Sequence, residues 1–326
     1  MSVNFKKYPK VDFHAHYIPQ AYLEGMMECF GGNPDRFPQP TWSAEKHIAF
    51  NKEMGIVYSL ISVSSPHLGF FGSPEYNKNL ARLCNEQGND IVKAYPNDFG
   101  LMASIPLPDV EAAIDEIAYC CDTLNCVGFT LPTNTKGKYI TDPDFIPVWE
   151  VLNRYGATVT FHPNKPSAVP SGVAEALPIP MMEFFFDTTR TVTDLIIKGY
   201  ITKYNNIKFV LPHVGALLGF IVDRLDSYKT ILVQTGAVES DFDMNSIMSR
   251  FYADTAGSSS AKQIPAMRQV LDDSHFLYAS DFPFTPDAVI EEQGTGLFEA
   301  TYMTDELREM FFYKNAEAFL GKKLVK

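Results

Sequence analysis

Short β-branched and apolar runs alternate with amphipathic stretches along almost the whole chain, and this alternation restricts the fold more than any other feature. The eight runs are residues 11–14, 57–63, 99–105, 127–131, 157–161, 207–211, 251–254 and 276–280. Apolar positions at helical spacing predict helices over residues 76–90, 109–122, 145–154, 188–203, 216–228, 261–272 and 305–320. Strand–helix units in this number predict the α/β class and a closed (β/α)₈ TIM barrel.

The length of the chain and two long segments refine this expectation. A barrel of 326 residues is expected to form one domain over residues 1–326, because every strand–helix unit adds to one shared core. Residues 17–41, rich in Gly, Pro and aromatic side chains, are interpreted as an insertion or lid after the first strand. Residues 164–186 form a second long segment. Both follow strands that carry polar candidates, so we expect them to shape the active site.

Composition and charge exclude several classes of protein. A net charge of -12 argues against a nucleic-acid partner, since binding to a phosphate backbone depends on clustered Lys and Arg. No run approaches the roughly 18 apolar residues of a membrane span, and no signal-peptide pattern opens the sequence, so we expect a cytoplasmic, soluble protein without a membrane partner. Five cysteines without CxxC spacing indicate reduced thiols in a core.

The motif DFHAH at residues 12–16 is the strongest local signal for chemistry. Alternate side chains of a strand point the same way, so His14 and His16 can face one metal ion. An HxH motif alone also fits ordinary core or surface histidines. Its position at the end of the first predicted strand favours the metal.

Three further polar side chains follow predicted strands. His162 follows the fifth strand, His213 the sixth and Asp281 the eighth. Catalytic groups of barrel enzymes come from the carboxyl ends of different strands, which open on one face. Three histidines with one carboxylate suit one divalent ion, with Zn²⁺ as first choice and Mn²⁺ as the alternative. The fourth strand end has no Lys or Glu to bridge a second metal ion.

Longer matches surround these residues, and they carry a family resemblance. They lie at residues 12–16, 99–109, 144–154, 186–190, 211–215 and 279–284, the last two reading LPHVG and ASDFPF. In these stretches the chain resembles the metal-dependent amidohydrolase superfamily. Within it, the chain resembles the branch of aminocarboxymuconate-semialdehyde decarboxylase, and most of all the members that act on 6-methylsalicylate. The resemblance runs nearly end to end.

The resemblance implies a role for each matched residue. The implied metal ligands are His14, His16, His162 and Asp281. His213 would be an unligated acid/base, and Asp281 could share the proton transfer by shifting off the metal. Arg224 lies eleven residues after His213, and in a relative an Arg at this spacing reaches the neighbouring subunit's site. Arg224 would then bind a substrate carboxylate in trans, in a homodimer or larger homo-oligomer; the alternative is an ion pair with Asp223 or Asp226.

Departures from the family pattern bear on the substrate. His47 stands where that relative carries a second substrate-binding Arg, so a monocarboxylate is favoured over a dicarboxylate. His67 and Phe284 are candidates for substrate contact, with a loop histidine and a core aromatic residue as the alternatives. The usual His-x-Gly-Gly is His213-Val-Gly-Ala216 here. Asp254, at the end of the seventh strand, is expected to orient a ligand or His213.

Two enzymatic functions follow from the same residues. The first is a metal-dependent, non-oxidative decarboxylase of a small aromatic or cyclic hydroxy acid, such as a 6-methylsalicylate-like compound. The alternative is a mononuclear hydrolase or hydratase in which His213 activates a water at the metal. A barrel kept as a non-catalytic binding protein is a third reading, which the intact ligand set disfavours.

Overall fold

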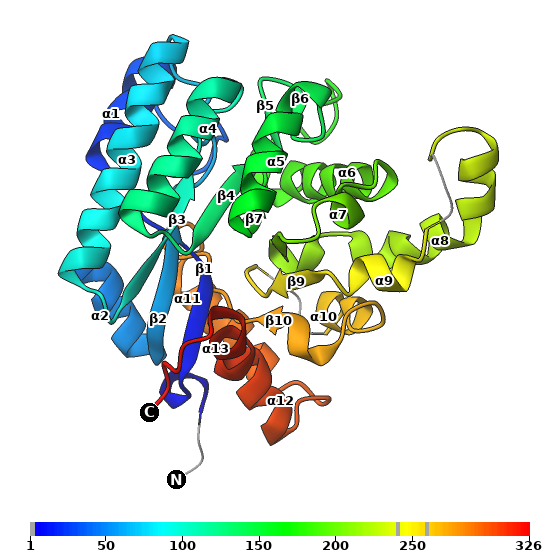
Figure 1. The fold of residues 1–326 in the computed structure, drawn as a ribbon. Helices are drawn as coiled ribbons and strands as arrows, with labels where there is room; N and C mark the ends of the chain where they lie inside the picture. Colours follow the sequence, from blue (N-terminus) through cyan, green and yellow to red (C-terminus); the bar gives the residue numbers. More distant parts are fainter. Residues whose placement is uncertain (1–3, 239–241, 258–260) are drawn as a thin grey trace.

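Eight parallel strands form the centre of the molecule (Figure 1). The computed structural model describes residues 4–238, 242–257 and 261–326. The strands follow the order β1-β2-β3-β4-β7-β8-β9-β10, which is their order along the chain. They are β1 (Lys10–His16), β2 (Ile56–Ser62), β3 (Phe99–Ser104), β4 (Gly128–Pro132), β7 (Thr158–His162), β8 (Lys208–Leu211), β9 (Phe251–Asp254) and β10 (Phe276–Leu277).

Hydrogen bonds between β1 and the residues around the end of β10 close the sheet. The Phe13 N–H donates to the carbonyl of Tyr278 at 2.9 Å, and the His16 N–H donates to the carbonyl of Phe282 at 2.7 Å. In the other direction, the Asp281 N–H donates to the carbonyl of His14 at 2.8 Å. The predicted (β/α)₈ barrel is therefore confirmed, and its closing seam brings Asp281 beside His14.

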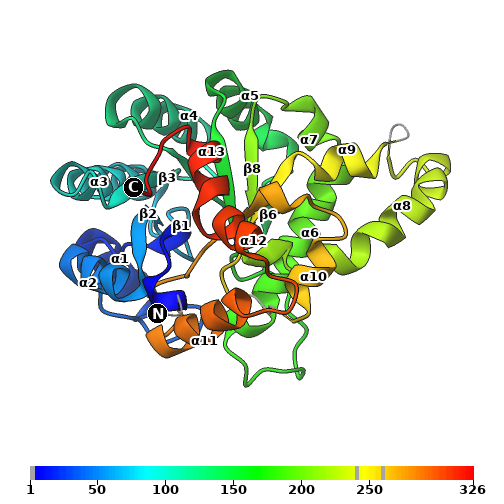
Figure 2. The same ribbon diagram turned by 90° about the horizontal axis from the view of Figure 1, so that it is seen from below.

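Helices surround the strands, as the view from below shows (Figure 2). The main ones are α3 (Pro74–Ala94), α4 (Val110–Tyr119), α5 (Ile146–Tyr155), α6 (Glu183–Ile197), α8 (Leu218–Gln234) and α10 (Gln263–Met267). Local signals set their ends: the Ser73 hydroxyl accepts from the Tyr76 N–H at the start of α3, and Pro74 occupies its first turn. Each of these six helices overlaps one of the predicted helical ranges, although α10 is shorter than its predicted range 261–272.

Three predicted ranges are not continuous α-helices, and the first of them, 109–122, passes from α4 into a π-helical turn (Cys120–Leu124). The range 188–203 is split into α6 and α7 (Tyr200–Lys203) by Gly199, whose φ of 69° ends the helical backbone. The range 305–320 consists of α12 (Asp305–Glu309), a π-helical turn (Met310–Lys314) and α13 (Asn315–Leu320). Spacing of apolar residues does not reveal such breaks, because it continues across them.

Several elements lie outside the predicted ranges. They are α1 (Gln20–Phe30), α2 (Ala44–Met54), the β5–β6 hairpin (Asn134–Thr135 and Lys138–Tyr139), α9 (Met244–Met248) and α11 (Asp287–Phe298). Thus the segment 17–41 begins with a helix, which ends where Gly31 adopts a φ of 67°. In the described part of the chain, no helix has both the length and the apolar character needed to cross a membrane.

The apolar core leaves one end of the barrel for polar chemistry. A cluster of strand residues that includes Val11, Phe13 and Leu60 packs against Phe319 of α13. The rings of Phe13 and Phe319 meet edge to face at 5.1 Å. Since all eight strands are parallel, their carboxyl ends, with the polar residues that follow them, lie together at one end of the barrel.

Candidate metal centre

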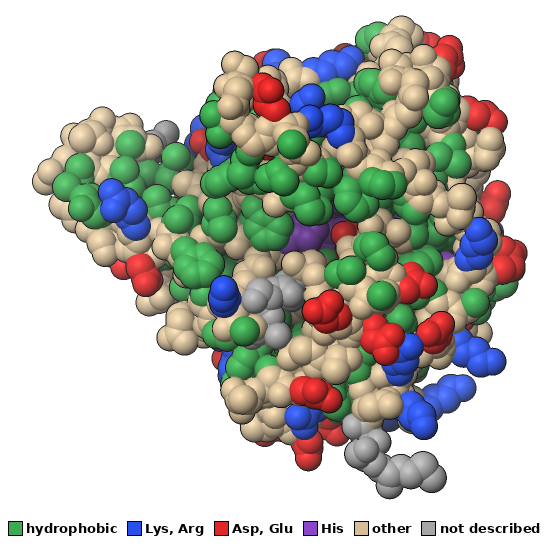
Figure 3. All heavy atoms as spheres, turned by 180° about the vertical axis from the view of Figure 1, so that it is seen from behind, with side chains coloured by type: hydrophobic (Ala, Val, Ile, Leu, Met, Phe, Trp, Pro, Cys, Tyr) green, Lys and Arg blue, Asp and Glu red, His purple; other side chains and the backbone are tan. Residues whose placement is uncertain are grey.

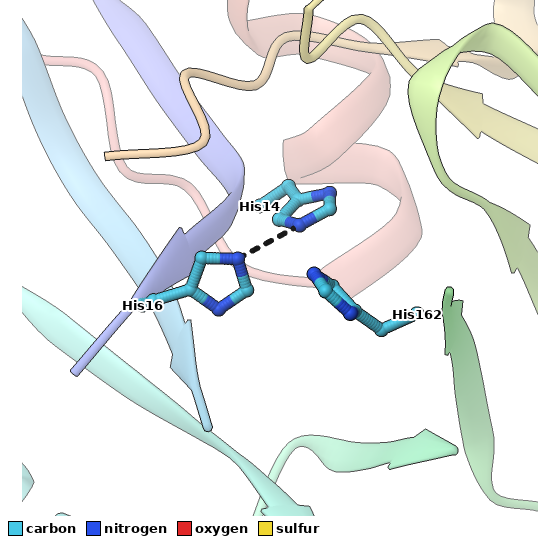
Figure 4. Close-up of side chains that lie close together, drawn as sticks. All are labelled: His14, His16 and His162. Atoms are coloured by element: carbon cyan, nitrogen blue, oxygen red, sulfur yellow. Dashed lines mark hydrogen bonds between the residues drawn. The ribbon is translucent and has the colours of Figure 1, made fainter. Parts of the chain in front are cut away.

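Three histidines converge at the carboxyl ends of two strands. His14 and His16 extend from β1 and His162 ends β7, and Figure 4 shows their rings turned toward one another. The His14 Nε2 and His16 Nε2 atoms lie 3.1 Å apart. One ligand atom from each of the three residues falls within 4.8 Å of the others, and all three residues are buried. This spacing is compact enough for a single ion.

The second nitrogen of each ring is directed to an acceptor. His14 Nδ1 lies 2.8 Å from Asp254 Oδ2, His16 Nδ1 lies 3.3 Å from the Ser62 carbonyl, and His162 Nδ1 lies 3.0 Å from the Pro163 carbonyl. A proton on Nδ1 satisfies each acceptor and leaves the Nε2 lone pair free. Imidazoles that bind metals in proteins are usually oriented in this way.

Asp281 completes the donor set, and His213 lies beside it. Asp281 Oδ1 is 3.1 Å from His16 Nε2 and 3.8 Å from His14 Nε2. The Thr285 hydroxyl donates to the other oxygen of Asp281 at 3.0 Å. His213 forms a second compact group with His14 and Asp281, again within 4.8 Å. Imidazole nitrogens with one carboxylate fit a divalent ion such as zinc or manganese.

Asp254 connects the two parts of the site. Besides contacting the ring of His14, this fully buried carboxylate accepts the His213 N–H at 2.9 Å and the Ala256 N–H at 3.1 Å through Oδ1. The structure thus agrees with the expectation that Asp254 orients a ligand or His213, since it contacts both.

Burial and charge set the protonation of these groups. Burial lowers the pKa of His16, and it lowers the pKa of His162 further still. Burial acts on His14 as well, but the charge and hydrogen bond of Asp254 outweigh it and raise the pKa of His14 to about 9. Burial raises the pKa of Asp281, but its hydrogen bond to His16 and the charge of His14 outweigh this and lower it to about 2. The site therefore holds neutral imidazoles at His16 and His162 and an ionised Asp281, while His14 is protonated and must lose a proton to bind a metal.

Strained backbone holds the catalytic candidates. The φ angles of His213, Val214 and Ala216 are 53°, 55° and 56°, and that of Asp281 is 61°. Left-handed backbone is unusual for residues other than glycine and is a true outlier for β-branched Val214. Ala216 occupies the second glycine position of the family's His-x-Gly-Gly motif, so its methyl group stands where glycine is better suited. Such strain, on the order of 1 to 3 kcal/mol per residue, concentrates at functional sites.

A cavity of about 440 Å³ opens over the centre. Figure 3 shows histidine at the floor of an opening rimmed by hydrophobic side chains. Residues of both long segments line it, together with His162, His213 and Asp281; they include Asn33, Asp35, Phe37, Pro180, Met181, Phe184 and Phe185. The walls are thus aromatic and apolar, and the volume suits a single substituted ring.

The predicted substrate contacts are distributed unevenly. Phe284 lines the cavity, and its ring lies 5.4 Å from that of His16. His67 is buried beside His162, with ring centroids 5.3 Å apart, and neither of its nitrogens has a hydrogen-bond partner in the part of the chain that the structure describes. Its neighbours Ser64 and Ser65 line the cavity, whereas His67 is not among the described lining residues.

The structure does not bring His47 or Arg224 to the cavity wall. His47 is fully buried on α2, where its Nδ1 accepts from the Trp42 indole at 3.1 Å and its ring packs against Phe282 at 4.8 Å. This aromatic packing, rather than an opening, surrounds the ring. Arg224 lies exposed on α8, with its guanidinium 5.2 Å from the Tyr228 ring. Asp226, the predicted alternative partner of Arg224, instead pairs with Lys229 at 3.3 Å.

Sequence reasoning missed part of the cavity wall. Asn33, Asp35, Ser64 and Ser65 all line the cavity. The serines directly follow β2, so their position at a strand end was an available signal. Asp35 carries no such signal, because it lies in an irregular part of the segment 17–41.

Comparison with known proteins assigns this centre to a family. The amidohydrolase family model matches residues 11–322. The chain belongs to the amidohydrolase family. A 6-methylsalicylic acid decarboxylase of Penicillium expansum is 32% identical, over 92% of each chain. The family match spans every predicted ligand.

Solved structures of this family share the barrel. A crystal structure of an amidohydrolase II has a TM-score of 0.90 and 34% identity, covering 96% of this chain and 100% of the other. A 5-carboxyvanillate decarboxylase of Novosphingobium aromaticivorans, at 19% identity, has a TM-score of 0.84 over 97% and 98% of the chains. That enzyme binds manganese and a nitrobenzoic acid. A divalent-metal site in the present chain is consistent with both the donor set and the family.

Proposed function

We propose that the chain is a metal-dependent, non-oxidative decarboxylase of a small aromatic hydroxy acid resembling 6-methylsalicylate. The observation that carries this proposal is His213, which lines an aromatic cavity beside the histidine–carboxylate centre. Its ring stacks on that of Phe185, with centroids 5.9 Å apart, at the cavity wall. The decarboxylase from Penicillium expansum, similar over nearly its full length, favours this reaction over hydrolysis or hydration.

His14, His16, His162 and Asp281 would hold the metal ion, because the three histidines offer donor atoms within 4.8 Å of one another and Asp281 Oδ1 lies 3.1 Å from His16 Nε2 and 3.8 Å from His14 Nε2. The other polar atom of each side chain is occupied. We propose Zn²⁺, which this donor set suits, with Mn²⁺ as the alternative favoured by the manganese-bound relative. When bound, such an ion supplies Lewis acidity toward the carboxylate and hydroxyl oxygens of the substrate.

The protein's own groups would then orient the ring and move the proton. Phe184, Phe185 and Phe284 line the cavity and would hold a planar ring by its faces and edges. His213 would donate a proton to the ring carbon that bears the carboxylate, which interrupts aromaticity. The carbon–carbon bond then breaks, its electron pair returns to the ring, and CO₂ leaves. Solvent would replace the proton that His213 gives up, and Asp281, within 4.8 Å of His213, would take up that solvent proton and pass it to the imidazole ring.

We further propose a homodimer or larger homo-oligomer in which Arg224 acts in trans. Helix α8 projects from the barrel in both ribbon views (Figures 1 and 2). It carries exposed apolar side chains, with Phe220 at 61%, Ile231 at 51% and Tyr228 at 48% exposure. A monomer rarely presents such a face to water. A partner subunit packed there would also meet Arg224.

The test is CO₂ release from 6-methylsalicylate, salicylate, dihydroxybenzoates and isoorotate by metal-loaded protein. We expect turnover of at least one acid, and a loss of about 100-fold or more in His213→Ala. His275→Ala is the matched control, because His275 precedes β10 and packs against Tyr252 outside the cavity. Protein that holds one metal ion per chain but releases no CO₂ would refute the proposal and direct assays to hydration.

A further inference from the structure

Asp35 is a buried carboxylate in the cavity wall. It lies in the segment after β1 and is 3% exposed, yet it lines the cavity that also contains His213 and Asp281. Its backbone is fixed on both sides: its N–H donates to Asn33 Oδ1 at 2.9 Å, and its carbonyl accepts the Ile179 N–H at 3.0 Å. Asp35 therefore sits where the two long segments meet, in a defined position.

The carboxylate of Asp35 is incompletely satisfied. Among the described residues, its Oδ1 atom is buried without a hydrogen-bond partner, and so is the hydroxyl of its neighbour Ser65. Burial raises the pKa of Asp35, while the nearby Ser65 hydroxyl and the charge of Lys165 lower it less strongly. Lys165 itself is exposed to solvent. A buried carboxylate without a close cation is unfavourable unless another group supplies the missing hydrogen bond.

The position of Asp35 indicates where that group comes from. Beside the histidine–carboxylate centre, the cavity is lined by a second set of polar side chains, in which Ser64 Oγ lies 3.5 Å from His162 Nε2; the set consists of Asn33, Asp35, Ser64, Ser65, Thr285 and Gln293. Aromatic and apolar side chains form most of the remaining wall. A ring bound at the centre in a cavity of about 440 Å³ would present its other substituents to the second set.

We propose that Asp35 determines specificity by accepting a hydrogen bond from a further ring hydroxyl of the substrate. That the ligand is a phenolic acid rests on the proposed function. That the ligand donates a hydrogen bond at this point of the cavity wall rests on Asp35 alone. An unpartnered carboxylate oxygen such as Asp35 Oδ1 is a hydrogen-bond acceptor. A ring with a further hydroxyl at the matching position, which 6-methylsalicylate itself lacks, is therefore preferred over a ring without it, and a second carboxylate there is repelled.

Equilibrium binding tests this independently of turnover. Manganese-loaded full-length protein is titrated in a calorimeter with 2-nitrophenol and with its hydroxylated derivatives, including 2-nitroresorcinol, 4-nitroresorcinol, 3-nitrocatechol and 2-nitrohydroquinone. We expect at least one derivative to bind on the order of 10- to 100-fold more tightly than 2-nitrophenol. Asp35→Ala should abolish that preference, and Asp35→Asn, which keeps one acceptor oxygen and the volume, should retain part of it. Asp90→Ala, on the exposed face of α3, should leave it unchanged.

Each outcome separates the two proposals. Equal binding of all the phenols, no binding of any, or a preference that survives in Asp35→Ala would overturn the role of Asp35. If Asp35→Ala does not fold, Asp35→Asn and Ser65→Ala replace it in the test. An undiminished preference for the hydroxylated phenol in both variants would also overturn the role of Asp35. An intact, Asp35-dependent preference in a protein that releases no CO₂ would refute the decarboxylase and leave this binding subsite established.

Discussion

Replacing Asp254 by Asn tests how the metal centre is held. The carboxylate accepts from His14 Nδ1 at 2.8 Å and, through its other oxygen, from the backbone N–H groups of His213 and Ala256. In Asp254→Asn the amide oxygen can keep the two backbone bonds, while the amide NH₂ faces His14. The imidazole must then accept at Nδ1 and carry its proton on Nε2, the atom that faces His16.

The expected loss of metal affinity can be estimated from this change of tautomer. Partners that orient a metal-bound histidine typically contribute 10- to 100-fold in metal affinity, or about 1.4 to 2.8 kcal/mol. We expect Asp254→Asn to weaken binding of Zn²⁺ and Mn²⁺ by this factor. Titration against a competing chelator measures it.

Asp187→Asn is the matched control. Asp187 is as fully buried as Asp254, but it accepts from Asn134 at 2.8 Å and Arg190 at 3.1 Å rather than from a histidine. Its substitution should lower the free energy of unfolding and leave metal affinity unchanged. An Asp254→Asn protein with the affinity of the wild type, or an equal loss in Asp187→Asn, would refute the reasoning.

Two further predictions concern pH and assembly. Burial lowers the pKa of His14, but Asp254 outweighs burial and raises this pKa to about 9, above the ordinary 6.5. Protonated His14 therefore stabilises the metal-free protein. This contribution to the free energy of unfolding should be complete below pH 6.5 and lost as pH rises through 9. Urea unfolding should show a decrease on the order of 3 kcal/mol, and a flat profile would contradict it. Arg224→Ala should lower kcat/KM about tenfold or more while light scattering shows an unchanged oligomer; a monomeric wild type, or unchanged kinetics, would remove the role in trans.

The sequence allowed prediction of the barrel and the residues of its centre more readily than the cavity wall. Strand runs and the DFHAH motif are local patterns, and parallel strands necessarily bring His162, His213 and Asp281 to one end. The acceptors for His16 and His162 are backbone carbonyls, which leave no trace in residue identity. His47 was matched by position to a substrate-binding residue, but its ring is enclosed by Trp42 and aromatic neighbours.

Irregular segments explain what else escaped prediction. Helix α1 escaped prediction although Tyr22, Met26 and Phe30 recur at helical spacing, because the Gly and Pro residues after Phe30 led to a loop-like interpretation of the whole segment 17–41. Asp35 reaches the cavity only because its carbonyl bonds to Ile179, more than a hundred positions away in the chain. Contacts of this kind depend on the whole fold, and no local spacing indicates them.

Decarboxylation in D₂O tests the central claim most directly. Metal-loaded protein is incubated with the acid that is turned over, and the ring product is examined by NMR spectroscopy and mass spectrometry. The account predicts one deuterium at the carbon that bore the carboxylate, formed together with one CO₂, and strongly reduced formation of both in His213→Ala but not in His275→Ala. A product that retains its carboxylate and has gained water, or deuterated product formed equally fast by His213→Ala, would contradict it.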